Sequence, residues 1–411
     1  MSAPLPVHAP VEQFSVHNDL LVVGGVPITE LAARIGQTPF YAYDRKVIDR
    51  QVAGLRAALP SAVKIHYAMK ANPMPAVVAH LGSKVDGIDV ASGRELRVAL
   101  DTGMDPSEIS FAGPGKSIAE LEQAVAARIL LNIESRREIE LLTAIGRTLN
   151  LKPRVAVRVN PDFELKSAGM RMGGGSKQFG IDAEEVPAVL KEVSIRDLGF
   201  EGFHIFWGSQ NLRADAICDA QRKSFDLAVS LAQSATLPVR VLNIGGGLGI
   251  PYFPGEKSLD PGPIGENLQM LVRRARTELP EASLVIELGR YLVGESGVYV
   301  CKVVDRKISR GHVFLVTDGG LHHHLAASGN FGQVIRKNYP VAIANRMRGT
   351  KREIASVVGP LCTPLDLLAD RMDLAEAHPG DLVAVFQSGA YGLTASPGGF
   401  LSHPAAVEIL L

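Results

Sequence analysis

Eight short runs of β-type residues, separated by stretches with helical periodicity, constrain the fold of this chain more than any other feature. They lie near residues 62–67, 85–90, 108–112, 128–133, 154–159, 200–206, 239–244 and 283–287. Alternating strands and helices indicate an α/β protein with a parallel sheet, either open and doubly wound or closed into a barrel. Eight units within about 240 residues favour a closed (β/α)₈ TIM barrel, which takes roughly 250 residues. We assign residues 41–298 to this barrel.

The two regions that flank the barrel have a different texture. Residues 1–40 have the pattern of strand and turn, with an apolar run at Leu20–Val23 that Gly24 and Gly25 end. After residue 298, β-type runs broken by glycine and proline lie at 298–304, 312–317, 353–359 and 381–386. We therefore expect a second, all-β domain built from residues 1–40 and 299–411.

A helix is expected just before the first barrel strand. Asp44 is a candidate N-cap, because aspartate accepts hydrogen bonds from the backbone N–H groups of a first helical turn. Apolar residues follow it at the spacing of one helix face, at Val47, Ile48, Val52, Leu55 and Leu59.

Composition excludes several classes of protein. The chain has 43 Lys and Arg against 43 Asp and Glu, so it offers no positive field for nucleic acid. No apolar run approaches the roughly 18 residues of a membrane span, and the first residues do not read as a signal peptide. The three cysteines are far apart, which predicts neither disulfides nor a zinc site. We expect a cytoplasmic protein without a metal or membrane partner.

Polar residues recur where the expected barrel strands end. Lys70, Asp89, Arg158, His204 and Glu287 each lie at or near the end of an apolar strand. The carboxyl ends of barrel strands meet at one mouth, where the chemistry of this fold gathers. Further candidates at the same strand ends are Asn72, Ser92, Asn160, Ser209, Gln210, Gly245, Gly246, Gly247 and Arg290.

Three of these features together match the needs of one cofactor. Lys70 at an apolar mouth has a poorly solvated ammonium, which lowers its pKa and lets the neutral amine form a Schiff base; a lysine that reaches out to solvent is an equally good reading of this residue alone. The glycines of Gly245–Gly249 can form a backbone nest for a phosphate, and they do not match a dinucleotide fingerprint. With Glu287 as an acid partner for a pyridine nitrogen, these groups fit pyridoxal 5'-phosphate.

At these residues the chain resembles the fold type III pyridoxal-phosphate decarboxylases. That family includes diaminopimelate, ornithine and arginine decarboxylases and shares its barrel with alanine racemase. The matching segments follow one another in family order, at residues 67–73, 89–93, 158–161, 208–210, 245–249, 287–290, 359–362 and 389–392. The resemblance implies a barrel followed by a β-sandwich domain that includes the N-terminal segment. It also implies a head-to-tail homodimer with active sites at the interface.

The resemblance assigns a role to each matching residue. Lys70 is the Schiff-base lysine, Glu287 the partner of the pyridine nitrogen, and Cys362 the proton donor to the α-carbon, supplied by the neighbouring subunit. The phosphate is held by Gly245, Gly246, Gly247, Arg290 and Tyr391. The other cofactor-binding candidates are Asp89, Arg158, His204, Phe206 and Ser209.

Three positions depart from the pattern of the family. Leu288 replaces a proline, Phe206 occupies the place of a histidine that stacks on the cofactor ring, and Thr363 replaces an acidic residue that helps to recognise the distal end of the substrate. The segment 321–333 also lacks the acidic pair expected for a diamine substrate. There the chain is similar to a subgroup with a glutamyl-carrier-protein decarboxylase of butirosin synthesis and the exosortase-associated decarboxylases.

The function that follows is removal of the α-carboxylate from an L-amino acid or from a carrier-protein-bound aminoacyl group. Three alternatives stay open at this point: a diaminopimelate decarboxylase that makes lysine, an amino-acid racemase, and a non-catalytic regulatory relative. The presence of Cys362 in its motif disfavours the racemase. The presence of Lys70, Glu287 and the glycine loop disfavours a relative that has lost its cofactor.

Overall fold

The computed structural model describes residues 7–163, 170–171, 173–333 and 335–411, with backbone alone at 170–171. The chain divides into two compact units. The barrel unit consists of Val52–Gly249 and Leu259–Tyr291, and the β unit comprises the chain up to Gln51 together with Ile250–Ser258 and Leu292–Leu411. The domain boundaries expected at 40/41 and 298/299 stay a prediction.

The barrel unit contains a closed ring of eight parallel strands. In order around the ring, each strand pairs with the next and the last pairs with the first. The strands are β5 (Val63–Ala68), β6 (Gly87–Val90), β7 (Ile109–Phe111), β8 (Leu130–Ile133), β9 (Arg154–Asn160), β12 (Gly199–Ile205), β14 (Val241–Asn243) and β15 (Ser283–Leu288). Each corresponds to one of the eight apolar runs in the sequence, which confirms the closed barrel over the open doubly wound sheet.

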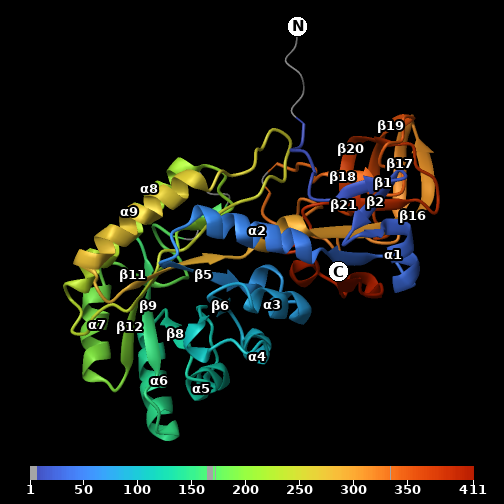
Figure 1. The fold of residues 1–411 in the computed structure, drawn as a ribbon. Coiled ribbons are helices and arrows are strands. Elements are labelled where there is room, and N and C mark those ends of the chain that lie inside the picture. Colours follow the sequence, from blue (N-terminus) through green and yellow to red (C-terminus); the bar gives the residue numbers. More distant parts are fainter. Residues whose placement is uncertain (1–6, 164–169, 172, 334) are drawn as a thin grey trace. The chain divides into compact units, whose positions relative to one another are not determined.

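Helices connect successive strands of the ring, as a parallel sheet requires. Figure 1 shows them around the barrel strands. They are α3 (Pro75–Gly82), α4 (Gly93–Asp101), α5 (Ile118–Ala126), α6 (Arg136–Leu149), α7 (Val186–Ile195), α8 (Ala214–Ala232) and α9 (Gly262–Glu278). The short strands β10 (Met170–Arg171), β11 (Ile181–Asp182) and β13 (Gly208–Ser209) lie in the loops after β9 and β12, and the short helix α10 (Arg290–Val293) follows β15.

Helix α2 (Arg45–Ala58) begins where the sequence predicted. The Asp44 side chain caps it, because Asp44 Oδ1 accepts a hydrogen bond of 2.8 Å from the backbone N–H of Lys46. Its other carboxylate oxygen accepts one of 2.9 Å from the backbone N–H of Gly24. The five apolar positions of the expected helix face are all buried.

The β unit is built on one long strand, β16 (Gly297–Ser309). Its first half pairs with β4 (Phe40–Tyr43) and β21 (Leu382–Val385), and its second half pairs with β17 (His312–Thr317). An irregularity between Val303 and Asp305 marks the change. Strands can switch between sheets at such irregularities, so β16 belongs to two sheets and the β unit is a β-rich near-barrel. Its further strands are β18 (Val341–Ile343), β19 (Arg352–Val358), β20 (Leu367–Ala375) and β22 (Val407–Leu410).

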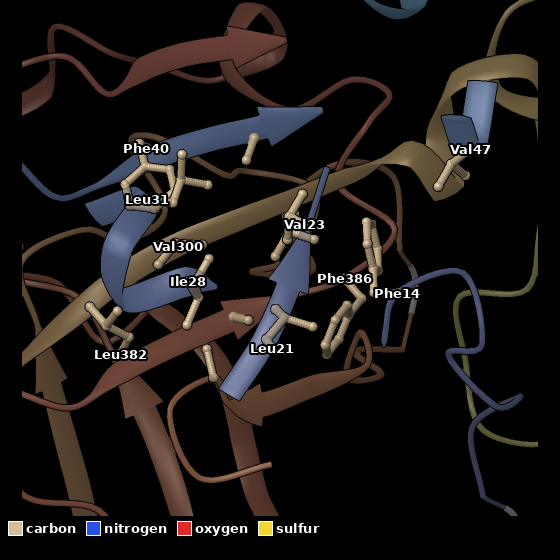
Figure 2. Close-up of a cluster of buried hydrophobic side chains, with 14 residues drawn as sticks. Phe14, Leu21, Val23, Ile28, Leu31, Phe40, Val47, Val300, Leu382 and Phe386 are labelled. Atoms are coloured by element: carbon tan, nitrogen blue, oxygen red, sulfur yellow. The ribbon is translucent and has the colours of Figure 1, made fainter. Parts of the chain in front are cut away.

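The expectation that the first 40 residues contain only strand and turn was incomplete. Strands β1 (Ser15–His17), β2 (Leu20–Val23) and β3 (Val26–Pro27) form a small antiparallel sheet, but the helix α1 (Ile28–Ile35) follows. Ile28 and Leu31 of α1 are buried in the core of the β unit, where Phe14 and Phe386 pack with ring centroids 6.0 Å apart (Figure 2). Ile28 and Leu31 have the spacing of one helix face, which could have indicated this helix. The turn residues Gly24, Gly25 and Pro27 directly before it favoured a prediction of strand and turn instead.

A layer of hydrogen-bonded polar side chains lies inside the barrel. His66 Nδ1 lies 3.0 Å from Asp89 Oδ1, which also accepts a hydrogen bond of 2.7 Å from Ser110 Oγ. Asn132 Nδ2 donates to Ser110 Oγ at 3.2 Å, so the network crosses β5, β6, β7 and β8. His66 Nε2 lies 3.8 Å from Glu108 Oε2. Burial alone would lower the pKa of His66, but the charge of Asp89, their hydrogen bond and the nearby Glu108 raise it to about 9.

This shift predicts a pH-dependent stability of the barrel. Since the pKa of His66 is raised on folding, its contribution is fully present below about pH 6.5 and is lost as pH rises through about 9. We expect the free energy of unfolding to fall by up to roughly 3 kcal/mol over this window. Urea unfolding of the wild type and of His66→Gln, measured from pH 6 to 10, checks this.

The variant should show a flatter pH profile, whereas His17→Gln, at an exposed histidine of β1, should keep the wild-type profile. Parallel profiles for wild type and His66→Gln would contradict the assignment.

Over the described residues, helices are too short or too polar to cross a membrane.

Candidate active site

Lys70 lies in a 3-10 turn, Met69–Ala71, directly after β5. The turn is held by Tyr67, whose hydroxyl donates a hydrogen bond of 2.8 Å to the carbonyl oxygen of Asn72. Lys70 Nζ lies 5.5 Å from the ring centroid of Phe206, a buried residue that follows β12. Lys70 itself is exposed. Of the two readings that the sequence left open, the exposed residue agrees with a lysine that reaches solvent, beside the ring of Phe206.

Glu287 is a buried carboxylate near the end of β15. Its Oε2 lies 2.7 Å from His204 Nε2 of β12 and accepts a hydrogen bond of 3.1 Å from Asn243 Nδ2 of β14. This short contact between His204 Nε2 and Glu287 Oε2 is one of the interactions that act on the carboxylate.

The surroundings of Glu287 keep it ionised. Burial alone would raise the pKa of Glu287, but His204, Lys70 and Arg158 lower it below its usual range. Lys70, in the turn after β5, and Arg158, from β9, thus act on the same carboxylate. The strand ends that the sequence singled out converge on one polar site within the barrel unit.

Arg158 is buried in β9 and forms an ion pair that sequence analysis missed. Its Nη1 donates to Glu134 Oε1 at 2.8 Å. Glu134 also accepts hydrogen bonds from the backbone N–H groups of Gly113, at 2.5 Å, and Gly180, at 3.1 Å. Burial alone would raise the pKa of Glu134, but Arg158 and Lys116 lower it. Glu134 directly follows β8, so the rule that found the other strand-end residues could have found it.

The loop after β14 requires glycine for steric reasons. Gly245 and Gly247 have φ of 72° and 70°, a conformation that favours glycine. A Cβ on Gly246 would lie 2.0 Å from the carbonyl oxygen of Glu287, and one on Gly247 would lie 2.7 Å from that of Gly208. The loop thus lies against β15 and β13, and the backbone N–H of Gly245 donates a hydrogen bond of 2.8 Å to Asn243 Oδ1. Successive backbone N–H groups in such a glycine loop suit an anion.

Two other predicted cofactor-binding residues, Ser209 and the phosphate candidate Arg290, lie in the barrel unit. Ser209 is half-buried in β13, and Arg290 is the first residue of α10. Asp89, predicted to bind the cofactor, contacts His66 and Ser110 through its Oδ1.

The remaining two predicted residues belong to the β unit. Cys362 is an exposed thiol in the loop that follows β19. Tyr391 is half-buried, with a φ of 53° and a ring centroid 6.2 Å from that of Phe331.

The consecutive histidines His322, His323 and His324 are buried in the β unit. Burial, with some help from His323 and His403, lowers the pKa of His322 to about 4, and burial lowers that of His324 to about 3. These two side chains are therefore neutral at pH 7. Within the described ranges, no group of three or more His, Cys, Asp or Glu residues is placed to hold a metal ion.

The barrel unit presents the groups that pyridoxal phosphate needs. A primary amine, Lys70, and an ionised carboxylate, Glu287, are close enough for the lysine to lower the carboxylate pKa. A glycine loop with two left-handed residues follows the adjacent strand β14. This donor set fits an aldehyde, a protonated pyridine nitrogen and a phosphate.

Comparison with known proteins decides the family. Residues 45–294 match the model described as "Pyridoxal-dependent decarboxylase, pyridoxal binding domain". This chain belongs to the pyridoxal-dependent decarboxylases. It is a pyridoxal-phosphate-dependent amino-acid decarboxylase: the strand-end residues predicted the cofactor, and the resemblance predicted the reaction.

Two curated relatives in this family cover nearly the whole chain. L-glutamyl-[BtrI acyl-carrier protein] decarboxylase of Niallia circulans is 40% identical over 389 residues, which cover 93% of this chain and 90% of the relative. Diaminopimelate decarboxylase of Aquifex aeolicus is 34% identical over 394 residues, which cover 95% of this chain and 90% of the relative.

A solved decarboxylase shows the same fold. The crystal structure of diaminopimelate decarboxylase from Helicobacter pylori complexed with L-lysine superposes with a TM-score of 0.83 at 27% identity. The match covers 93% of this chain and 94% of that one. The barrel and the β-rich unit are thus both features of the decarboxylase family.

Proposed function

We propose that this decarboxylase acts on an aminoacyl group attached to a carrier protein, with an L-glutamyl group as the first candidate. The observation that carries this proposal is the 40% identity, over 93% of the chain, with a decarboxylase of an L-glutamyl carrier protein. Thr363, uncharged at the position after Cys362, agrees with a substrate whose distal end is a thioester rather than a free charge.

We assign the cofactor to the barrel unit. Lys70 would bind its aldehyde, Glu287 would keep its pyridine nitrogen protonated, and Phe206 would lie against its ring. Gly245–Gly247 would receive the phosphate, with Ser209, Arg290 and Tyr391. When bound, pyridoxal phosphate supplies an electron sink for the bond that breaks as carbon dioxide leaves.

The neighbours of Glu287 support its part in this assignment. Lys70 and Arg158 supply positive charge near the buried carboxylate, which therefore stays ionised and can hold a proton on the pyridine nitrogen. Arg158 is itself held by Glu134 and so keeps a fixed position.

Cys362 would complete the reaction. After carbon dioxide leaves, its thiol would donate a proton to the α-carbon, so that a hydrogen replaces the carboxylate. Its exposed position in the β unit agrees with a role in the barrel of a second copy. We therefore include a head-to-tail homodimer in the proposal.

A carbon dioxide release assay tests the substrate. We expect the holoenzyme to have a kcat/KM on the order of 10²-fold higher or more for L-glutamyl carrier protein than for free L-glutamate or diaminopimelate, since remote contacts with the carrier add binding energy. The second candidate is a diaminopimelate decarboxylase, which the 34% identity with the Aquifex aeolicus enzyme favours. Faster turnover of free diaminopimelate would establish that candidate and reject the carrier-bound substrate.

A further inference from the structure

A groove of about 580 Å³ lies in the β unit beside the loop that carries Cys362. Its walls come from β16, β17, β19, β20 and the loop between β19 and β20. Leu361 and Thr363, the two chain neighbours of the exposed Cys362, both line it. The groove therefore reaches the residues on either side of Cys362.

The Cys362 loop is held in place by Asp366. Its carboxylate is buried and accepts hydrogen bonds from the backbone N–H groups of Leu361, at 2.8 Å, and Leu321, at 2.6 Å. A Cβ on Gly359 would lie 2.3 Å from this carboxylate, so only glycine allows the loop to pass there. The charge of Asp366 is thus directed at two backbone N–H groups, and the groove wall on this side is fixed.

The middle of the groove combines apolar and polar groups. Phe314 and Val316 of β17 form part of an apolar wall. Beside them, His312 Nε2 lies 3.0 Å from Ser356 Oγ, which donates a hydrogen bond of 3.0 Å to Asp370 Oδ1. Such a lining suits a chain in which methyl and methylene groups alternate with amides.

The groove also carries positive charge. Lys307 and Arg371 both line it and are exposed. The exposed carboxylate in the groove is Asp370, and one of its oxygens is already engaged by Ser356. The two cations therefore provide a site for an anionic group of a molecule bound in the groove.

We propose that this groove binds the phosphopantetheine arm of a carrier protein. The thioester end would lie beside Leu361 and Thr363, the amides along His312 and Ser356, and the phosphodiester at Lys307 and Arg371. The volume is within the usual range for sites of ligands of this size. This inference rests on the proposed carrier-bound substrate and adds where the arm lies.

Charge reversal at the cationic positions tests the phosphate site. We compare an L-glutamyl carrier protein with the L-glutamyl thioester of N-acetylcysteamine, which lacks the phosphate, as substrates of the holoenzyme. In Lys307→Glu/Arg371→Glu, the ratio of the KM for the carrier protein to that for the small thioester should rise at least about tenfold, because two attractive contacts become repulsive.

Arg128→Glu is the matched control. Arg128 is exposed and has a φ of 59°, close to the 47° of Arg371, but it belongs to the barrel unit and does not line the groove. It should leave the KM ratio unchanged. An unchanged ratio in the double variant as well would overturn the inference.

A second variant tests the groove without changing charge. Val316 is half-buried in the groove wall, so Val316→Trp should fill the space. Calorimetry with free 4'-phosphopantetheine should show binding to the wild-type holoenzyme and at least a tenfold weaker affinity in this variant. Equal affinities, or no binding to the wild type, would overturn the groove assignment.

The two proposals fail in different ways. A wild-type enzyme that does not decarboxylate the carrier-bound substrate rejects the proposed function. A wild-type enzyme that does so, but whose groove variants leave the KM ratio and phosphopantetheine affinity unchanged, rejects the groove alone. If sedimentation shows that the groove variants lose self-association while the KM ratio stays constant, a second copy covers the groove and the inference is wrong.

Discussion

Lys70→Ala is expected to fold normally and to lose decarboxylase activity on the order of 10⁴-fold or more, because no other group can replace a covalently acting amine. Carbon dioxide release measures the loss. Lys70 is exposed, so its removal leaves no cavity in the core. The circular dichroism spectrum and the unfolding midpoint should therefore match those of the wild type.

Chemical labelling makes this prediction specific to one residue. Borohydride reduction of the wild-type holoenzyme, followed by digestion and mass spectrometry, should place the cofactor on the Lys70 peptide. Lys191→Ala, at an exposed lysine of α7, should keep full activity and the same labelled peptide. A label on any other lysine would contradict the assignment of Lys70.

Mixed dimers of Lys70→Ala and Cys362→Ala are expected to recover activity that neither variant has alone. Cys362 is an exposed thiol of the β unit, whereas Lys70 belongs to the barrel unit. If each active site takes the cysteine from the other protomer, a heterodimer contains one intact site. Random mixing gives about half heterodimers, and hence roughly a quarter of the wild-type activity.

Cys218→Ala is the matched control for this experiment. Cys218 is buried in α8, and burial raises the pKa of its thiol, so it is a poor proton donor or nucleophile. The variant should be active by itself. If isotope-labelled subunits show that exchange has occurred and no activity returns to the Lys70→Ala and Cys362→Ala mixture, the two residues do not act across a dimer interface.

The local sequence determined the architecture of this protein. The barrel strands were predictable because each combines β-type apolar residues with turn signals within a few positions, and the same holds for β2 at Leu20–Val23. Asp44 at the start of α2 was predictable because capping involves neighbours in the chain. Polar residues at the ends of the predicted strands pointed to Lys70, Arg158, His204 and Glu287, since parallel strands bring their carboxyl ends together.

Only the tertiary structure decided which of these groups pair. Glu287 lies against His204 and Asn243, and Arg158 against Glu134, because parallel pairing places β12, β14 and β15, and likewise β8 and β9, side by side. Strand order in a closed barrel can be anticipated, but the side-chain geometry that lowers the pKa of Glu287 depends on burial and distances that no local pattern encodes.

The tertiary structure also decided how exposed the reacting groups are. The sequence left open whether Lys70 is poorly solvated or reaches solvent, and in the structure the residue is exposed beside Phe206, since solvation depends on what packs around a side chain. Thr363 was only a departure from a motif in the sequence. In the structure it lines a groove with Lys307 and Arg371, residues brought there by the pairing of β16, β17, β19 and β20. Sheet pairing joins residues that are far apart in the chain, so only the folded molecule shows this surface.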